Sequence, residues 1–193
     1  MSVSKEKQLE IEAMRRESIL DVALPLFFKH GYKKTTILDI AKAAKMSKGL
    51  VYHYFANKEE ILFSYQSDLS SCLDEIRHIE SAKEALWTFG TRFLSTPDQS
   101  GYIPPLQVYV LVYIRGEIDE SAYPNPISDN FGRQFFAPIF EKGIEQGEFK
   151  AGDPEILGNL FWHFLLGHIT DFIRRPDSQI SRAALKEMIG LFE

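Results

Sequence analysis

The stretch SKGLVYHYFANKEE (residues 47–60) decides the fold, because it places three aromatic rings, an imidazole and a glycine around one short helix. At about 100° per residue, Val51 and Phe55 lie on one side of that helix. Gly49 and His53 lie on the opposite side. The two apolar side chains therefore anchor the helix to its own domain, and the opposite side is left for another molecule to face.

The residues that flank the outward side suit nucleic acid. Tyr52 and Leu50 lie beside it, and Tyr54 lies nearer the core edge, from which it can reach sideways. Gly49 costs roughly 1 kcal/mol of helix stability relative to alanine, which is understandable if a base edge or backbone must approach closely. Tyrosine hydroxyls and His53 can bond phosphates or base edges, and Leu50 can contact a thymine methyl.

A second short helix precedes this one. Thr36-x-x-Asp39 is a capping box that opens a helix to about residue 44, and after a tight turn Ser47 caps the helix of residues 47–55. Two short helices joined in this way match the helix-turn-helix motif, whose second helix enters the major groove. Both N-termini offer amide groups to phosphate. The lysines around this face are Lys34, Lys48 and Lys58.

The charge distribution supports a nucleic-acid partner, although the chain of 193 residues carries a net charge of −5. Residues 29–58 hold seven lysines and one acid, whereas residues 61–193 hold 11 basic and 19 acidic side chains. Such a basic patch on an acidic chain is a localised electrostatic footprint. The alternative is a lysine-rich face that is merely solvated.

The whole chain reads as helices, so we expect an all-α fold of about nine helices. The N-terminal residues lack a secretory signal, and the apolar run 104–114 is too short to span a bilayer, so we expect a cytoplasmic protein. The single cysteine, Cys72, excludes an intramolecular disulfide and a cysteine-based zinc site. The predicted helices are 5–29, 36–44, 47–55, a long one from Asn57 to about 76, 81–94, 106–117, 127–146 with a kink at Pro138, 153–174 and 178–192.

The segment TILDIAKAAKMSKGLVYHYFANKEEIL (36–62) resembles the DNA-binding segment of TetR-family transcriptional repressors. ILDVALPLFFKHGYKKTT (19–36) resembles the helix that precedes it in that family, and the detailed match covers about residues 15–65. The resemblance implies a DNA-binding domain over 12–72, with its motif at about 35–54, and an effector-binding and dimerisation domain over 73–193. It implies DNA contacts by Thr36, Lys48, Gly49, Tyr52, Tyr54 and Lys58; Leu50 departs from the threonine of many members.

The helix at 153–174 carries two apolar stripes, so it needs two burial partners. One partner can be its own domain and the other a second subunit, in agreement with the four-helix dimer bundle that the resemblance implies. We therefore expect a homodimer, which also supplies two recognition helices for two half-sites. The candidate interface residues are Phe161, Trp162, Leu165, Leu166, Ile169 and Ile173.

The family's C-terminal domain usually holds an effector pocket, and aromatic side chains here are candidates to line it. Plain core packing is the alternative for each of them. Arg92 and Arg115 leave an anionic effector open. His163 and His168 are too far apart around a helix to chelate one metal. Asp74 and His78 are four residues apart and could do so, and the alternative that we favour is a simply exposed pair. The candidate lining residues are Trp87, Phe93, Tyr109, Tyr113, Phe135 and His163.

We therefore expect a homodimeric, sequence-specific transcriptional regulator that binds double-stranded operator DNA, a repressor released by a small-molecule effector. It should need no cofactor, metal or membrane. No hydrolase, zinc-protease, phosphate-loop or dinucleotide motif is present, so we do not expect an enzyme. Two alternatives stay open: a family activator or effector-independent regulator, and a helical carrier or enzyme whose N-terminal unit is structural.

Overall fold

A computed structural model describes residues 5–95, 105–118, 130–174 and 182–193. These parts of the chain contain ten α-helices, one π-helical segment and no strand, which confirms the expected all-α class. The elements are α1 (Lys5–His30), α2 (Ile37–Ala43), α3 (Lys48–Tyr54), α4 (Lys58–Phe63), α5 (Gln66–Arg77), α6 (Ala82–Phe93), α8 (Pro105–Ile114), η1 (Gly132–Phe136), α9 (Ala137–Glu145), α10 (Pro154–Arg174) and α11 (Arg182–Gly190).

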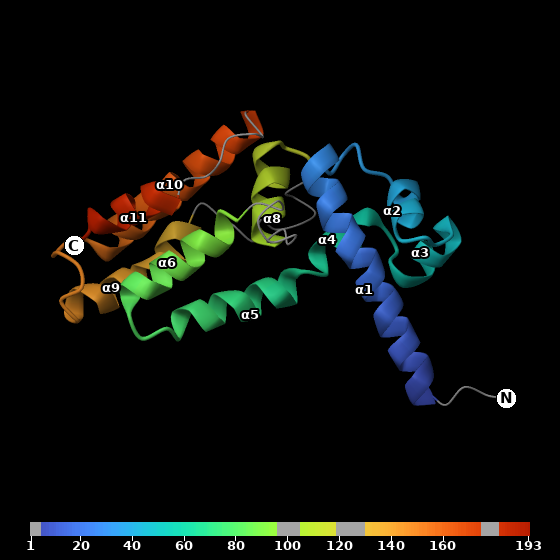
Figure 1. Cartoon of the computed structure of the whole chain (residues 1–193), viewed down its shortest axis with the longest axis horizontal. Helices are drawn as coiled ribbons and strands as arrows, with labels where there is room; N and C mark the ends of the chain where they lie inside the picture. Colours follow the sequence, from blue (N-terminus) through green and yellow to red (C-terminus); the bar gives the residue numbers. More distant parts are fainter. Residues whose placement is uncertain (1–4, 96–104, 119–129, 175–181) are drawn as a thin grey trace.

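The molecule has two lobes, which Figure 1 shows side by side. The helices α1 to α4 form one lobe, and the helices α5, α6 and α9 to α11 form the other, with α8 between them. The N-terminal half of α1 extends away from both. Among the side chains buried in the first lobe are Ile19, Ala23, Phe27, Ile40, Val51, Phe55, Ile61 and Leu62.

Helix ends in the first lobe follow the predicted signals. Gly31 takes φ +85°, the left-handed conformation that ends α1. Thr36 and Asp39 form the reciprocal capping box of α2, and Ser47 Oγ accepts the Leu50 N–H at 3.1 Å. The turn between α2 and α3 needs a second left-handed residue, Lys45 at φ 56°.

The long helix predicted from Asn57 to about 76 is wrong, because the chain breaks between α4 and α5. Ser64 Oγ donates to the Glu60 carbonyl at 2.7 Å, and the Tyr65 hydroxyl donates to the Leu20 carbonyl of α1. The Tyr65 amide donates to the Leu62 carbonyl at 3.5 Å, three residues back rather than four. A tertiary bond to α1 thus pulls Tyr65 out of the helical path and ends α4 there.

The kink predicted at Pro138 takes the form of the π-helical segment η1, which ends two residues before it. Proline lacks an N–H, and in a regular helix its ring would clash with the carbonyl of Gln134. A widened turn before the proline removes that conflict. The irregularity expected near Pro138 is therefore the π-helical turn that directly precedes α9.

Aromatic packing dominates the second lobe. Phe89 of α6 lies 4.9 Å from Phe136 and 5.3 Å from Phe135, and Trp162 of α10 lies 4.7 Å from Phe131, measured between ring centroids. Edge and offset contacts of this kind contribute about 0.5–1.5 kcal/mol each beyond area burial. This aromatic cluster consists of Phe89, Phe93, Phe131, Phe135, Phe136 and Trp162.

Helix α8 is buried on all sides, since every residue from Pro105 to Val112 is buried. Its one buried amide, Gln107, donates to the Phe93 carbonyl at 3.2 Å and so satisfies an end carbonyl of α6. Tyr109 donates its hydroxyl to the Leu62 carbonyl of α4 at 2.6 Å. The helix between the two lobes thus also satisfies a carbonyl at the broken end of α4.

Candidate nucleic-acid interface

The helix α3 has only seven residues, so tertiary contacts must hold it. Val51 and Phe55 are buried, as predicted, with 0% and 1% of their surface exposed. Arg16 of α1 donates to the Tyr54 carbonyl at 2.6 Å, and its guanidinium lies 4.2 Å from the centre of the Phe55 ring. Arg16 therefore fixes the C-terminal end of α3, a role that sequence reasoning missed.

The outward side of α3 carries the residues that the helical phase predicted. Lys48, Gly49, Tyr52 and His53 are exposed, and Tyr52 keeps 48% of its surface open. The Lys48 ammonium lies 5.7 Å from the centre of the Tyr52 ring, so charge and ring lie together. Half-buried Leu50 and Tyr54 border this side.

Gly49 has no intramolecular reason to be a glycine. A Cβ atom added to it would meet nothing within 4 Å, and its φ is not in the left-handed region. Alanine would fit and would stabilise the helix by roughly 1 kcal/mol. The small residue therefore makes sense as room for a molecule that approaches α3 from outside.

The N-terminus of α2 forms the second part of the face. Thr36 Oγ1 lies 2.6 Å from Asp39 Oδ2, and Thr36 N–H donates to the same oxygen at 2.9 Å. These bonds hold the pKa of the Asp39 carboxyl below its ordinary value. Lys34 and Thr36 are exposed beside this N-terminus, and Ser47 is exposed at the start of α3.

Lys58 differs from the other lysines of the predicted face. Its ammonium donates to the carbonyls of Tyr32 and Thr35, at 2.6 and 3.0 Å, and lies 4.1 Å from the centre of the Tyr32 ring. Burial lowers its pKa, which the nearby carboxylates of Glu59 and Glu117 partly offset. Two of its three N–H groups thus hold α4 to the turn after α1, so at most one can reach DNA.

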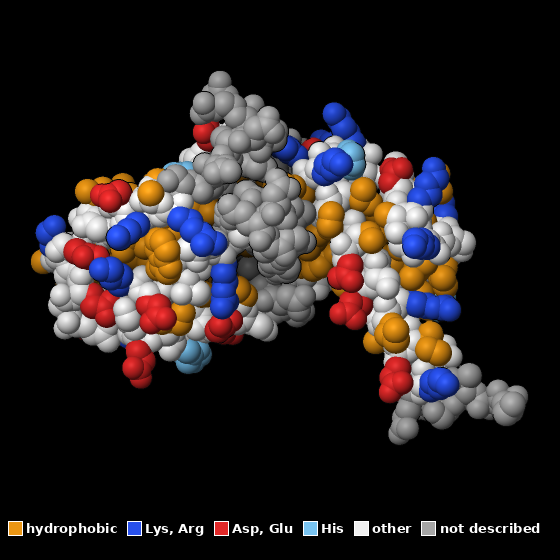
Figure 2. All heavy atoms as spheres, in the orientation of Figure 1, with side chains coloured by type: hydrophobic (Ala, Val, Ile, Leu, Met, Phe, Trp, Pro, Cys, Tyr) orange, Lys and Arg blue, Asp and Glu red, His pale blue; other side chains and the backbone are white. Residues whose placement is uncertain are grey.

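The remaining basic side chains lie at the surface of the first lobe. Figure 2 shows Lys and Arg side chains along the outer edge of the lobe formed by α1, α2 and α3. The six other lysines of residues 29–58 are all exposed. A hollow between α1 and α2 is lined by Leu26, Lys29, His30, Lys34, Thr35 and Asp39. The first lobe thus presents an electropositive surface, although the protein as a whole is acidic.

Comparison with known proteins assigns the chain. The family model of bacterial regulatory proteins of the tetR family matches residues 19–65. The transcriptional repressor KstR2 of Rhodococcus jostii is 30% identical over 145 residues, which cover 71% of this chain and 69% of KstR2. The chain belongs to the TetR family.

Two further similarities show how far the likeness extends. The regulator HbdR of an Aromatoleum strain is 37% identical over 84 residues, which span 39% of this chain and only 37% of HbdR. A crystal structure of AibR in complex with isovaleryl coenzyme A and operator DNA has a TM-score of 0.59 at 22% identity. That similarity covers 92% of this chain and 97% of AibR, and it shows that the likeness in fold extends through both lobes.

The structure does not bring the six predicted effector-pocket residues of this TetR-family chain together. Phe93 and Phe135 belong to the aromatic cluster, whereas Tyr109 is buried against Phe63 of α4. Tyr113 is half-buried at the far end of α8. His163 is exposed on α10, and Trp87 lies in a surface groove between α6 and α11. Only Phe93 and Phe135 share one environment, and it is packed core.

The predicted dimer interface of the TetR-family chain needs a correction. Phe161, Trp162, Leu165 and Ile169 are at most 4% exposed, because they pack into their own lobe, so they are unavailable to a partner. Leu166 is half-buried, and the side chain of Ile173 lies outside the described residues. The exposed side of α10 is a different stripe, at spacings of three and four, made of Ile156, Leu160, His163, Gly167 and Thr170.

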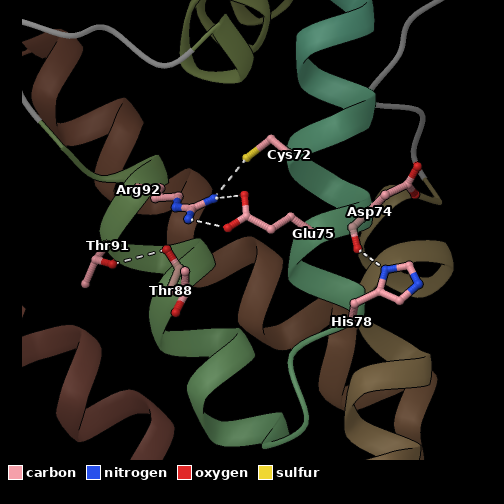
Figure 3. Close-up of polar contacts among 7 residues, drawn as sticks. All are labelled: Cys72, Asp74, Glu75, His78, Thr88, Thr91 and Arg92. Atoms are coloured by element: carbon pink, nitrogen blue, oxygen red, sulfur yellow. Dashed lines mark hydrogen bonds and ion pairs between the residues drawn. The ribbon is translucent and has the colours of Figure 1, made fainter.

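Polar contacts tie α5 to α6, as Figure 3 shows. Arg92 donates to both carboxylate oxygens of Glu75, at 2.8 and 2.9 Å, and lies 3.6 Å from the Cys72 sulfur. This pair lowers the pKa of Glu75 and raises that of Arg92. Arg92 thus pairs with a carboxylate of its own chain.

The metal pair considered from sequence does not form either. His78 Nδ1 lies 2.6 Å from the backbone carbonyl of Asp74, not from its carboxylate (Figure 3). Over the described parts of the chain, no group of three or more metal-ligating side chains comes together. None of the described helices is long and apolar enough to cross a membrane.

Proposed function

We propose that the chain is a homodimeric repressor that binds operator DNA through α3 and is released from it by a small molecule. The observation that carries the DNA half is the exposed side of α3, where Lys48, Gly49, Tyr52 and His53 face outward from a helix that is fixed from behind. The lobe is basic and the rest of the chain acidic, so a polyanion is attracted to this lobe alone.

Each part of the face has a role in the proposed complex. Tyr52, His53 and Leu50 would contact base edges in the major groove, and Gly49 would admit the DNA close to the helix backbone. Tyr54 would reach sideways from the edge of the face. Phosphates would be bound by the side chains of Lys34, Thr36, Ser47 and Lys48 and by the remaining N–H of Lys58.

Dimerisation would use the exposed stripe of α10 that begins with Ile156 and Leu160, which keep 57% and 50% of their surface open. Apolar side chains so exposed on a long helix are suited to a second copy of the same helix. Two copies would place their α3 helices on half-sites about 34–36 Å apart or a multiple of that. The domain division near residue 72 would then separate a DNA-reading unit from a dimerising one.

The proposed repressor role rests on the similarity to KstR2, which is named a repressor, and the proposed effector on AibR, which was crystallised with isovaleryl coenzyme A and operator DNA. The second lobe here is apolar and aromatic, so a ligand with an apolar body suits it. Acyl-coenzyme A thioesters are therefore the first class to screen. Effector and DNA would weaken each other reciprocally. Such a regulator would act in the bacterial cytoplasm and would need no catalytic activity.

DNA binding can be tested by fluorescence anisotropy with a duplex from the region upstream of the protein's own gene. Affinity should fall steeply with salt, since each phosphate contact releases counterions. Tyr52→Phe and Lys48→Ala should each weaken binding by about tenfold, while size-exclusion chromatography shows an intact dimer. Exposed Lys150→Ala, in the second lobe, is the matched control. Binding that ignores salt, or loss of the dimer in either variant, would contradict the proposed face.

The two alternatives have their own tests. An activator or effector-independent regulator would bind the same DNA but show no change in affinity or thermal stability with any acyl-coenzyme A. A helical carrier or enzyme with a structural first lobe would leave the mobility of the duplex unchanged at low salt.

A further inference from the structure

The C-terminal end of α8 bonds directly to the turn that follows α1. Glu117 Oε2 accepts the Tyr32 N–H at 2.7 Å, and the Gly116 carbonyl accepts a bond from the Lys33 ammonium at 2.8 Å. We name these four residues the α8 clasp. The two halves of the clasp are more than 80 residues apart in sequence, so the bonds join the end of α8, the helix between the two lobes, to the DNA-binding lobe.

Backbone hydrogen bonds at the end of α8 fix the position of Glu117, whose carboxylate bonds to the turn after α1. Gly116 takes φ +58°, its N–H donates to the Tyr113 carbonyl at 2.9 Å, and the Glu117 N–H donates to the Val112 carbonyl at 3.0 Å. This pair of bonds is the Schellman ending of a helix, which fixes the two residues that follow it. The carboxylate is therefore presented by a rigid helix end.

The opposite side of the clasp is also a helix end. Gly31 N–H bonds back to the Phe27 carbonyl at 3.0 Å, which closes the end of α1. The next amide, that of Tyr32, donates to Glu117. A Cβ atom on Gly31 would lie 3.1 Å from Glu117 Oε1, so glycine there both supplies φ +85° and leaves room for the carboxylate.

The turn transmits this position to α2. Thr35 is buried, and its hydroxyl bonds to the Leu26 and Gly31 carbonyls at 3.2 and 2.8 Å. The next residue, Thr36, is the N-cap of α2. Lys58 bonds to the Tyr32 and Thr35 carbonyls from α4. The backbone from Gly31 to Thr36 is thus held by bonds to α1 and α4, and the Tyr32 amide adds a bond to Glu117 at the end of α8.

We propose that Glu117 is a positioning residue for DNA recognition, whose carboxylate sets the orientation of α2 and α3 relative to the second lobe. This inference rests on the proposed function. The orientation of the DNA-binding lobe matters only if the two DNA-binding lobes of a dimer must meet two half-sites together. Without the acceptor, the DNA-binding lobe samples more orientations, and ordering it on the operator costs affinity. The affinity for non-specific DNA, which requires no fixed half-site spacing, should not change.

The test compares Glu117→Ala, which removes the acceptor, with Glu117→Gln, which removes the charge but keeps an acceptor oxygen. Anisotropy is measured on a duplex that the wild-type protein selects from a random library and on a scrambled duplex of equal length. We expect Glu117→Ala to weaken specific binding about tenfold and to leave scrambled binding within about twofold. Glu117→Gln should stay within about threefold of wild type on both duplexes.

Further variants keep the outcome decisive. Gly116→Ala keeps the carboxylate but strains its helix end, so it should weaken specific binding in the same direction and serves if Glu117→Ala does not fold. Glu84→Ala, exposed on α6, controls for charge. Unchanged specific binding in Glu117→Ala, or equal tightening by Ala and Gln on both duplexes, would overturn the inference. If wild-type protein does not discriminate the duplexes, the proposed function itself fails, and the inference with it.

Discussion

The DNA-binding lobe holds its short helices α2, α3 and α4 by capping side chains and by cations that bond carbonyls, whereas packed rings hold the helices of the second lobe together. In the first lobe, Arg16 and Lys58 bond the carbonyls of three other residues, and Ser47 and Thr36 cap their helices. In the second lobe, the ring centroid of Phe89 lies within 6.5 Å of the centroids of five other rings. Directional polar bonds fix where the face points, and aromatic packing supplies the stable base behind it.

The largest effect should come from the aromatic cluster. Phe136 is fully buried, and Phe136→Ala should lower the free energy of unfolding by about 3–5 kcal/mol, since it loses burial and leaves a cavity. Guanidinium denaturation monitored by circular dichroism would measure the loss. Trp87→Ala, at a residue that is 36% exposed, should cost clearly less. A loss below about 1 kcal/mol for Phe136→Ala would mean that the cluster does not hold the second lobe.

A cation of the first lobe should have the next largest effect. Arg16→Met removes a charged hydrogen bond to the Tyr54 carbonyl, so we expect a loss of about 1.5–3 kcal/mol. Operator affinity should fall about tenfold, because the end of α3 is no longer fixed. Arg15→Met, an exposed neighbour on the same helix, is the matched control for charge. Equal losses in both variants would indicate that charge alone, rather than the bond to α3, is responsible.

The same difference explains what sequence could predict. Caps and glycine turns are local, so the ends of α2, α3 and α10 were predicted from Thr36, Ser47 and Asp153, and the outward side of α3 followed from its phase. The break between α4 and α5 depends on the bond from Tyr65 to a carbonyl of α1, and the apolar spacing continues across it. Nothing local marks that break.

The second lobe shows the limit most clearly on α10. Its apolar side chains surround the helix, and the sequence offers no means of telling which stripe faces its own lobe. The structure places Phe161 and Leu165 inside and leaves Ile156 and Leu160 outside. Rings such as Phe93 and Phe135 look alike whether they line a pocket or fill a core, because both need the same apolar spacing. Only packing distinguishes them.

The capping box of α2 should give a smaller effect. Thr36→Ala removes the N-cap acceptor and should cost about 1 kcal/mol, whereas Thr36→Ser keeps the hydroxyl and should cost little. Thermal unfolding followed by circular dichroism would measure both. If Thr36→Ser destabilises as much as Thr36→Ala, the methyl group rather than the cap is responsible.

The pH dependence of that cap follows from Asp39. The bonds from Thr36 hold the pKa of Asp39 below its unfolded value of about 3.9. A depressed folded pKa contributes stability that is present above the unfolded pKa and is lost as the pH falls through the folded one. The difference in Tm between wild type and Asp39→Asn should therefore be constant from pH 7 to about pH 5 and shrink below about pH 4. A difference that grows on acidification would contradict the assignment.

The smallest effect should come from the pair that joins α5 to α6. Arg92 and Glu75 bond through two oxygens but stay about half exposed, at 45% and 60% of their side-chain surface. Solvent screens such pairs, so Arg92→Met should shift Tm by no more than about 3 °C. A larger shift would mean that α5, despite its exposed contact, is held by a directional bond as the helices of the first lobe are. For the screened pair that we expect, high salt should remove most of the difference in Tm between wild type and Arg92→Met.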